Sequence, residues 1–374
     1  MERTIFEPTH DAFRGMVRSF LERDVVPEYA AWETGARPPQ DFWRRAGRAG
    51  LLGIGVPAAH GGLAGSDFRH SVVVTEEAQR AGLALGGIRL HTDICMPYFL
   101  EYADESQQER WLPRLAAGDA AVALAMSEPG AGSDMKAMST SAVRDGDHYV
   151  VNGAKTFISN GLGADLVIVA VKTDPGAGRH GISLLVVEAD SPGFTRGRSL
   201  EKIGLKAQDL SELFFSDVVV PVENLLGEEG RGFDYLTSNL AQERLSLAVN
   251  AQAAAATVLS DSVVAAAASG SAGQNAKFEL AACKAEVEAG QALLDRAIAV
   301  HVVGRLDAAE AALVKLYCTE LHGRVADRCL QLGGAESFAT SSRVGRSWAD
   351  ARVSRIYGGS SEIMKVIVAK SLGL

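Results

Sequence analysis

The sequence predicts an α+β protein in three parts: a helical N-terminal domain, a middle antiparallel β-barrel or sandwich, and a C-terminal helical bundle. Apolar residues recur at helical spacing in the first third of the chain, short β-type runs follow, and long Ala- and Leu-rich helical segments complete it. We therefore expect an N-terminal helical domain over residues 1–118, a β-domain over 119–225 and a helical bundle over 226–374.

The N-terminal part carries helical signals. Phe13, Val17 and Phe20 recur at the spacing of one helix face. The stretch ESQQERWLPRLAAG has an acidic first turn, and we expect a helix that is capped by Ser106 and ends on Gly118.

The middle part reads as strands. AAVALAMS, DHYVVNG, KTFIS, DLVIVAVKT, ISLLVVE and ELFFSDVVV are separated by turns that contain Gly, Asn, Asp or Pro. No helical pattern lies between consecutive strands, so parallel βαβ units are disfavoured and an antiparallel arrangement is predicted.

The C-terminal part predicts long helices over residues 233–267, 276–303 and 307–332, with a shorter helix after Ser360. Long helices that are joined by short connections indicate an antiparallel bundle.

Composition excludes some kinds of partner. The 374 residues are 47% hydrophobic and 22% charged, and their formal net charge is −9. Nucleic-acid binding normally needs a basic patch, and we predict none. The N-terminus is polar and acidic, unlike a signal or transit peptide, and no uninterrupted apolar run approaches membrane-spanning length. We expect a soluble cytoplasmic protein without membrane insertion.

The cysteines indicate the redox environment. Cys95, Cys283, Cys318 and Cys329 are scattered and form no CxxC pair. This spacing suggests neither a disulfide framework nor a zinc site, so we predict no metal and a reducing compartment.

The segment AMSEPGAGSD, from Ala125 to Asp134, follows a predicted strand. Gly130 and Gly132 let the backbone approach a ligand closely, while Ser127 and Ser133 offer hydroxyls. A plain Gly-rich turn explains the segment equally well. It is not a dinucleotide-binding fingerprint, because it lacks GxGxxG and no helix follows it.

The segment NGAKTFISNG places Phe157 two residues before Ser159 in a predicted strand, so both side chains are expected on one face. An aromatic wall beside a hydroxyl suits a flat, hydrogen-bonding ring such as a flavin. The alternative is a core phenylalanine next to an exposed serine.

The segment NLAQERLSLAVNA places two charged residues on an apolar helix face. Glu243 and Arg244 fall within the stripe formed by Leu236, Leu240 and Leu247. Buried charges are costly unless they are paired or used in function. The alternative to a functional role is a buried Glu–Arg ion pair that links helices.

The segment RIYGGSSEIMKVI predicts a Tyr357-Gly358-Gly359 turn, after which Ser360 or Ser361 caps a short helix. The free N–H groups at such a helix start can bind a carbonyl oxygen or the sugar of a cofactor. By itself the segment is only a helix cap.

In this order, EPGAGSD, NGAKTFISNG, KIGLKAQDLSELFFSDVVVP, QERL and IYGGSSEIM resemble the acyl-CoA dehydrogenase family, most closely its long-chain and isovaleryl-type members. LLGIGVPAAHGG adds to the likeness, which extends over nearly the whole chain. The resemblance implies a four-helix C-terminal bundle and assembly as a homodimer or homotetramer. It also implies FAD between the middle and C-terminal domains, with an electron-transfer flavoprotein as the type of electron acceptor.

The resemblance assigns site residues. The flavin ring would contact Met126, Ser127, Ser133, Phe157 and Ser159. The adenine end would reach Gln331 to Gly334 of a neighbouring subunit, and Ser360 to Glu362 would serve the other end of that contact. The substrate would meet Ser133, Arg244, Gly358 and Gly359, and the segment from His91 to Leu100 would line the acyl pocket.

The resemblance also separates two positions for the catalytic base. Many members carry it in a Tyr-Glu-Gly turn near the C-terminus, where this chain has Gly358. Long-chain and isovaleryl-type members place it on a bundle helix just before an arginine, which matches Glu243 and Arg244. Glu243 would remove the α-proton of an acyl thioester while flavin N5 takes the β-hydride. The Gly358 N–H and a flavin ribityl hydroxyl would hold the acyl carbonyl.

Two segments depart from the family pattern. The stretch AAAASGSAGQNAKFEL, residues 265–280, lacks the Arg and the Phe–Gly that grip the FAD pyrophosphate, and QLGGAESF lacks the fuller glycine pattern. Looser FAD binding, pyrophosphate contacts from elsewhere, or completion of the site by a different subunit would follow. The alternatives are therefore a partner subunit of a hetero-oligomeric dehydrogenase, or a dehydrogenase or oxidase that acts on an acyl-carrier-protein thioester.

Overall fold

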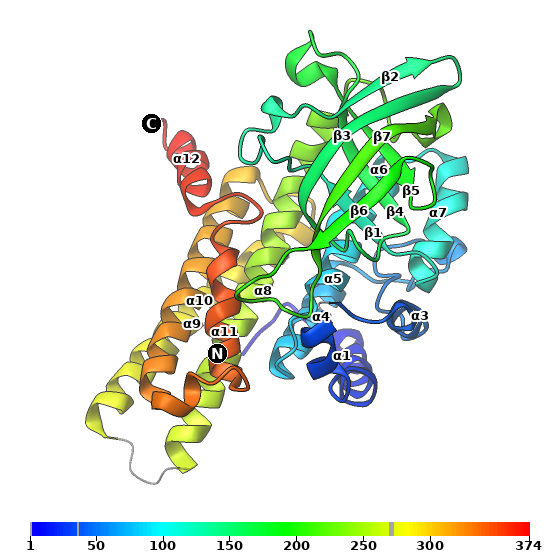
Figure 1. Ribbon diagram of the computed structural model, residues 1–374. Coiled ribbons are helices and arrows are strands. Elements are labelled where there is room, and N and C mark those ends of the chain that lie inside the picture. Colours follow the sequence, from blue (N-terminus) through cyan, green and yellow to red (C-terminus); the bar gives the residue numbers. More distant parts are fainter. Residues whose placement is uncertain (1, 36, 269–272) are drawn as a thin grey trace.

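A computed structural model describes residues 2–35, 37–268 and 273–374. Figure 1 shows an N-terminal group of helices, a curled sheet beside it, and an elongated helical bundle that extends away from both. The predicted α+β class with helical, β and helical parts in this order is confirmed. The predicted domain boundaries stay a prediction.

The N-terminal part contains short helices. They are α1 (Pro8–Phe20), α2 (Tyr29–Gly35), α3 (Gln40–Arg48), α4 (Phe68–Arg80), α5 (Gly86–Arg89), α6 (Met96–Tyr102) and α7 (Glu105–Ala117). Between α5 and α6, the π-helical segment η3 (Leu90–Cys95) continues the same helical path. The expected Ser106 cap of α7 is wrong: Asp104 is the N-cap, and its carboxylate accepts the N–H of Gln107 at 2.9 Å.

The sheet has the strands β1 (Val122–Ala125), β2 (Ser141–Asp145), β3 (His148–Ser159), β4 (Leu166–Lys172), β5 (Ile182–Glu188), β6 (Phe194–Ser199) and β7 (Leu210–Pro221). Its order is β1-β4-β2-β3-β7-β6, and β5 also pairs with β4. Most ladders are antiparallel as predicted, but β1 pairs with β4 in parallel, and β2 also makes a short parallel pairing with β4 at Ser141 and Lys172. The β2–β3 hairpin fills the connection between β1 and β4, so this parallel pair has no crossover helix.

The C-terminal part consists of α8 (Gly232–Ala268), α9 (Gln274–Val302), α10 (Ala308–Ser337), α11 (Arg343–Ser354) and α12 (Ser361–Ser371). The sequence did not predict α11. By length and composition α8 is long and apolar enough to cross a membrane, although polar and charged residues interrupt its apolar run. In the structure α8 instead packs against α4, α9 and α10, and its Leu245, Ala248 and Val249 belong to a buried cluster of the bundle.

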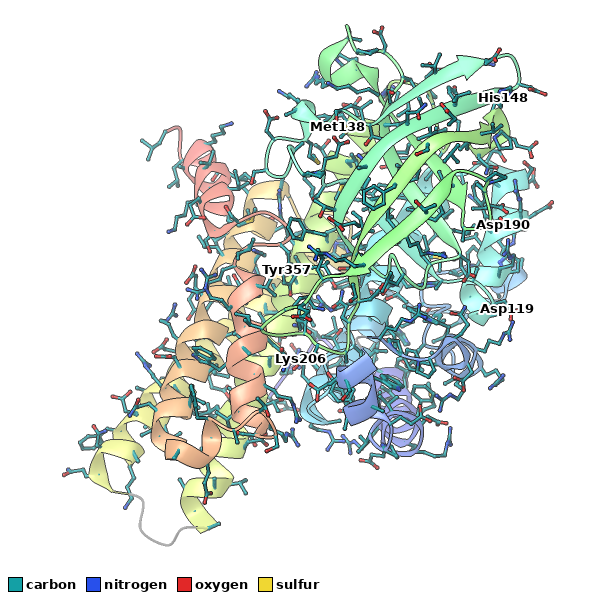
Figure 2. The ribbon with its side chains drawn as sticks, viewed as in Figure 1. Asp119, Met138, His148, Asp190, Lys206 and Tyr357 are labelled. Carbon is teal, nitrogen blue, oxygen red and sulfur yellow. The ribbon has the colours of Figure 1, made fainter. Side chains whose placement is uncertain are left out.

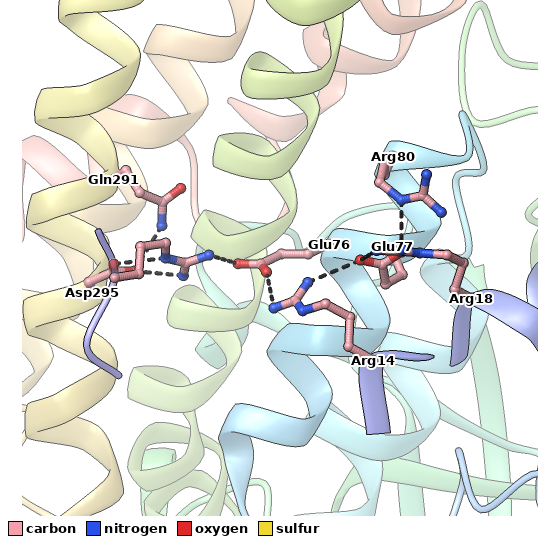
Figure 3. Close-up of polar contacts among 8 residues, drawn as sticks. Arg14, Arg18, Glu76, Glu77, Arg80, Gln291 and Asp295 are labelled. Carbon is pink, nitrogen blue, oxygen red and sulfur yellow. Dashed lines mark hydrogen bonds and ion pairs between the residues drawn. The ribbon is translucent and has the colours of Figure 1, made fainter. Parts of the chain in front are cut away.

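An ion-pair network joins the N-terminal helices to the bundle (Figure 3). Arg3 bonds Asp295 of α9 at 2.7 Å and Glu76 of α4 at 2.5 Å. The adjacent Glu77 is buried and accepts from Arg14, Arg18 and Arg80. Burial raises the pKa of Glu77, but these arginines outweigh it and bring the pKa to about 2. The network therefore links α1 to α4 and, through Arg3, links α4 to α9.

The loop between β6 and β7 docks the β-domain on the bundle. Figure 2 labels Lys206, on the part of this loop that reaches α11. The Leu205 N–H donates to the Asp350 carboxylate of α11 at 2.5 Å. A Cβ at Gly204 would lie 2.6 Å from the carbonyl oxygen of Ala349, so this approach requires glycine. The contact fixes the sheet relative to the bundle.

Candidate active site

A row of polar contacts joins the helical stretch 86–102 to the first half of α8, and we call it the polar seam. Tyr98 donates its hydroxyl to Oε1 of Glu243 at 3.1 Å, and Ser246 donates to the Asp93 carboxylate at 2.5 Å. The other pairs are Arg89 with Ser246, Gln242 with the Asp93 carbonyl, and Tyr102 with Ser238. Buried contacts between helices are usually apolar, so the polar seam marks a site that serves more than packing.

Glu243 lies in the middle of the polar seam and is 5% exposed. Burial raises the pKa of its carboxyl to about 7, while the Tyr98 hydroxyl and the charge of Arg244 act in the opposite direction. Arg244 is also buried, and its Nε has no hydrogen-bond partner among the described residues. The two side chains influence each other by charge without forming a helix-linking ion pair, which disfavours the purely structural alternative.

The Gly358–Gly359 turn lies against α8. A Cβ at Gly358 would come within 2.1 Å of Cδ1 of Leu247, one helical turn beyond Glu243, and the φ angles of the two glycines are +64° and +92°. Only glycine fits both the space and the backbone here. Ser360 then caps α12 by accepting the N–H of Ile363 at 3.4 Å, as the sequence predicted. The structure thus brings the turn to the helix that carries Glu243 and Arg244.

Lys315 of α10 holds this turn. Its side chain is buried, and Nζ donates to the carbonyl oxygen of Gly359 at 2.8 Å. Burial lowers the pKa of Lys315 to about 8, and the charge of Arg244 acts in the same direction. Sequence reasoning missed Lys315, although a lysine at a buried position of an apolar helix was the available signal. Lys315 is therefore a positioning residue for the Gly358–Gly359 turn. Figure 2 labels Tyr357, which directly precedes this turn.

Replacement of Lys315 by Met is expected to lower kcat about 10- to 100-fold, because the Gly359 carbonyl loses its donor and the Gly358 N–H is no longer held in place. Steady-state rates with flavin content measured in parallel test this, and KM should change less than kcat. Lys365→Met on the exposed face of α12 is the control. An unchanged kcat in Lys315→Met would rule out the positioning role.

The EPGAGSD segment is held by a buried ion pair. Nζ of Lys155 donates to Oε1 of Glu128 at 2.8 Å and to the Met126 carbonyl at 3.1 Å. The Glu128 carboxylate also accepts from Ser139 and Thr140. Burial alone would raise the pKa of Glu128, but these donors outweigh it and lower the pKa to about 2. Sequence reasoning missed this pair, which fixes the segment from Met126 to Glu128.

The predicted residues of this segment lie in different environments. Met126 packs against the core cluster that includes Tyr98, and Ser127 accepts the N–H of Thr156 at 2.9 Å through its carbonyl. Ser133 is exposed farther along the loop. The structure therefore packs Met126 against the cluster that includes Tyr98, fixes Ser127 to the neighbouring strand β3, and leaves Ser133 exposed.

Phe157 is 64% exposed and has a φ of +58°, in a bulge where the β3–β7 register shifts between Lys155 and Ile158. The bulge interrupts the regular alternation on which the expected common face of Phe157 and Ser159 depends, and that common face stays a prediction. The core-phenylalanine alternative is wrong, while Ser159 is half-buried. A large ring that is exposed by a strained backbone fits contact with a flat cofactor.

The residues proposed for the adenine end lie apart from the polar seam. Gln331 and Gly334 are exposed at the far end of α10, which kinks where Gly334 has a φ of +65°. Sixteen residues separate Gln331 from Lys315, about 24 Å along a helix. At the start of α12, Ser360 is half-buried and Glu362 is exposed. Within one chain, Gln331 and Gly334 do not meet Ser360 and Glu362. In the 265–280 stretch, which differs from the family pattern, residues 269–272 lie outside the described residues.

His10, Asp67 and His70 form a group whose ligand atoms lie within 4.8 Å of one another. Nδ1 of His10 accepts the Glu7 N–H at 3.0 Å, and Nδ1 of His70 accepts the Asp67 N–H at 3.2 Å. These bonds complete the N-terminal caps of α1 and α4, and Arg69 pairs with Asp67 at 2.7 Å. Helix capping explains the group, and the expected absence of a metal stays a prediction.

Family models match most of the chain: the acyl-CoA dehydrogenase N-terminal domain over residues 7–119, the middle domain over 123–218 and the C-terminal domain over 230–373. The chain belongs to the acyl-CoA dehydrogenase family. The mitochondrial long-chain specific acyl-CoA dehydrogenase of Sus scrofa is 40% identical and covers 99% of this chain and 88% of its own. The mitochondrial isovaleryl-CoA dehydrogenase of Pongo abelii is 32% identical, and the match covers 97% of this chain and 91% of that protein. The solved acyl-CoA dehydrogenase from Geobacillus kaustophilus is 44% identical, covers 100% of both chains and has a TM-score of 0.96.

Family membership confirms the resemblance and its consequences for activity. Acyl-CoA dehydrogenases are flavin-dependent oxidoreductases, so the predicted enzyme class and FAD are confirmed. The predicted likeness to long-chain and isovaleryl-type members is confirmed as well. The roles of individual residues in the site remain predictions.

Proposed function

We propose that this acyl-CoA dehydrogenase uses Glu243 as the base that removes the α-proton of an acyl-CoA thioester. The observation that carries the proposal is a buried carboxylate in the polar seam whose pKa is raised to about 7 by burial. A base with a pKa near the working pH combines an ionised population with adequate basicity. When bound, FAD supplies the acceptor for the hydride that leaves the β-carbon.

The other residues of the site bind and polarise the substrate. The N–H of Gly358 would donate to the thioester carbonyl, which makes the α-proton acidic by stabilising negative charge on that oxygen. Arg244 and Lys315 place positive charge beside the same turn. Gly359 completes the turn, Met126, Ser127, Ser133, Phe157 and Ser159 would hold the ring of FAD, and Gln331, Gly334, Ser360 and Glu362 would serve its adenine end in an assembled oligomer.

The pH dependence of kcat/KM tests the role of Glu243. Only the ionised carboxylate accepts a proton, so kcat/KM should rise about tenfold per pH unit below about 7 and level off above it. Initial rates between pH 5 and 9 with a saturating dye acceptor measure the curve. A profile that is flat from pH 5 to 8 would mean that a carboxyl group of ordinary pKa, or another residue, is the base.

The proposed partners are an electron-transfer flavoprotein as acceptor and further copies of this chain in a homodimer or homotetramer. Exposed Phe278, Phe338, Trp348 and Ile356 on and beside the bundle helices support an oligomer, because large apolar side chains gather at interfaces. The four free, buried cysteines support a reducing compartment such as the cytoplasm.

Rates on CoA and carrier-protein thioesters, with and without an electron-transfer dye, test the substrate and the acceptor. Turnover of the CoA ester that requires the dye supports the proposal. Turnover of the carrier-protein ester alone, or direct reduction of oxygen, would replace it with a carrier-protein dehydrogenase or an oxidase. A purified protein without flavin that binds a second, different subunit would indicate a partner subunit.

A further inference from the structure

The carboxylate of the proposed base has one bonded and one unbonded oxygen. Oε1 of Glu243 accepts the hydroxyl of Tyr98 at 3.1 Å, whereas Oε2 has no hydrogen-bond partner among the described residues. The neighbouring Arg244 acts on this carboxylate by its charge, without a hydrogen bond to either oxygen. A carboxylate turns easily about its last bond. The contact at Oε1 therefore decides where Oε2 lies.

Tyr98 is held more firmly than the carboxylate that it bonds. Its side chain is fully buried and belongs to the core cluster that also contains Phe99, Trp111 and Leu236. Tyr98 comes from α6 and Glu243 from α8, so the bond joins two helices from different parts of the chain. A ring that is locked by packing can hold a mobile catalytic group in one orientation.

The hydroxyl of Tyr98 is a donor at neutral pH. Burial and the charge of Glu243 raise its pKa well above the usual value, so it keeps its proton. Asn239, one helical turn before Glu243, lies close to the same hydroxyl, and its buried Nδ2 has no hydrogen-bond partner of normal geometry among the described residues. A hydroxyl can donate to a carboxylate and, after rotation, accept from a neutral carboxyl or an amide. Tyr98 can thus serve both protonation states of the base.

The titratable groups that face Glu243 come from three elements. Tyr98 lies on α6, Cys95 ends η3, and Arg244 lies on α8 itself. Burial raises the pKa of the Cys95 thiol well above its usual value, and a guanidinium keeps its charge, so neither titrates near pH 7. Lys315 of α10, with a pKa of about 8, acts on Arg244 and is the same in every variant compared below.

Resting on the proposed function, we propose that Tyr98 is the positioning residue of the base: its hydroxyl fixes Oε1 of Glu243 and leaves Oε2 to take up the α-proton of the thioester. The hydrogen bond lowers the basicity of the carboxylate, because it favours the ionised form. It improves the orientation, because proton transfer needs the accepting oxygen close to the carbon and aligned with it. Loss of the hydroxyl should therefore give a stronger base that is poorly placed.

Tyr98→Phe removes the hydroxyl and keeps the ring. On the full-length, FAD-loaded enzyme, the midpoint of the pH profile of kcat/KM should move up by about one pH unit. The alkaline plateau of kcat should fall about tenfold, while KM changes less than about twofold. Initial rates between pH 5 and 9.5 with the dye acceptor measure both. A midpoint that does not move, or a plateau kcat equal to or above that of the wild type, would overturn the positioning role.

Tyr149→Phe is the matched control. Tyr149 is also buried and donates to a carboxylate oxygen, Oε2 of Glu229, at 2.8 Å, but this pair joins β3 to the segment before α8. The same atom is removed, so the control should change neither the midpoint nor kcat. A shift of the same size in Tyr149→Phe would also overturn the inference, because the shift would then not come from the contact with Glu243.

Unfolding in urea separates this inference from the proposed function, because it needs no turnover. The pKa of Glu243 is about 7 in the folded chain, against a usual 4.5, so the stability that Glu243→Gln gains over its parent grows with pH and levels off above 7. In the Tyr98→Phe background this gain should grow for about one further pH unit. Gains that level off at the same pH in both backgrounds would overturn the role of Tyr98 alone. An active Glu243→Gln would instead overturn the proposed function, whatever the unfolding curves show.

Discussion

Replacement of Glu243 by Gln is expected to lower kcat about 10³- to 10⁴-fold while FAD remains bound. Gln has nearly the same shape, and its amide oxygen can still accept the Tyr98 hydroxyl that bonds Glu243 at 3.1 Å. It cannot take up a proton near neutral pH, so the α-proton has no acceptor. Dye-coupled formation of the enoyl thioester measures the rate, and the flavin absorption band measures the bound FAD.

The same substitution should stabilise the fold in alkaline solution. The pKa of Glu243 is about 7 in the folded chain, against a usual value of 4.5. The folded state therefore holds this proton more tightly, and the stability it contributes below pH 4.5 is lost as the pH rises through 7. This difference between the pKa values of Glu243 in the folded and unfolded chain corresponds to about 3 kcal/mol in the free energy of unfolding. Glu243→Gln should be more stable than the wild type by about 2–3 kcal/mol at pH 8 and by much less at pH 5.

Glu109→Gln is a matched control, because Glu109 is exposed on α7 and makes none of the contacts of the polar seam. It should change neither the rate nor the unfolding midpoint in urea. If Glu243→Gln kept more than a tenth of the wild-type kcat, Glu243 would not be the base. If it were destabilised equally at pH 5 and 8, the pKa of Glu243 would not be raised in the folded protein.

Glu243 could be predicted because its signal is local. A carboxylate within an apolar helical stripe is anomalous from the sequence of one helix, and burial in α8 confirms that anomaly. Tyr98 could not be assigned in this way, since its role depends on a contact with a residue distant in sequence. For Lys315 the apolar helix around it gave a local signal of burial, but its role appears only in its contact with the distant Gly359. The Glu128–Lys155 ion pair could not be predicted from the sequence either, because 27 residues separate the two partners.

Regular patterns also failed where the backbone is irregular. Phe157 lies in a bulge, where the alternation of a regular strand does not predict the direction of a side chain, and its ring is exposed. The parallel β1–β4 pair joins two strands that are separated in the chain by the β2–β3 hairpin, so no pattern within either strand predicts it. Helix α11 has a mixed sequence, RVGRSWADARVS, and most of its packing is against α10 and α8. Tertiary contacts decide such elements more than propensity does.

Replacement of Lys155 by Met is expected to destabilise the protein by about 3–5 kcal/mol at pH 7, because it leaves the Glu128 carboxylate buried without its cation. The effect should shrink as the pH falls. In the variant, burial raises the pKa of Glu128, and protonation removes the unpaired charge. Urea unfolding at pH 4.5 and 7 measures the difference, and flavin content should fall because the Met126 carbonyl loses its donor.

The double variant Glu128→Gln/Lys155→Met decides between loss of the charge pair and loss of packing. With both charges gone, no buried ion is left unpaired, so the double variant should recover a large part of the stability that Lys155→Met loses. Ser139 and Thr140 donate to different oxygens of the Glu128 carboxylate, so the single amide oxygen of glutamine at this position can keep the bonds of one of them and the recovery should be incomplete. If the double variant were as unstable as Lys155→Met at pH 7, the loss would come from changed packing at position 155 or from the lost bond to the Met126 carbonyl, and not from an unpaired carboxylate. The segment from Met126 to Glu128 would then not be held by the ion pair.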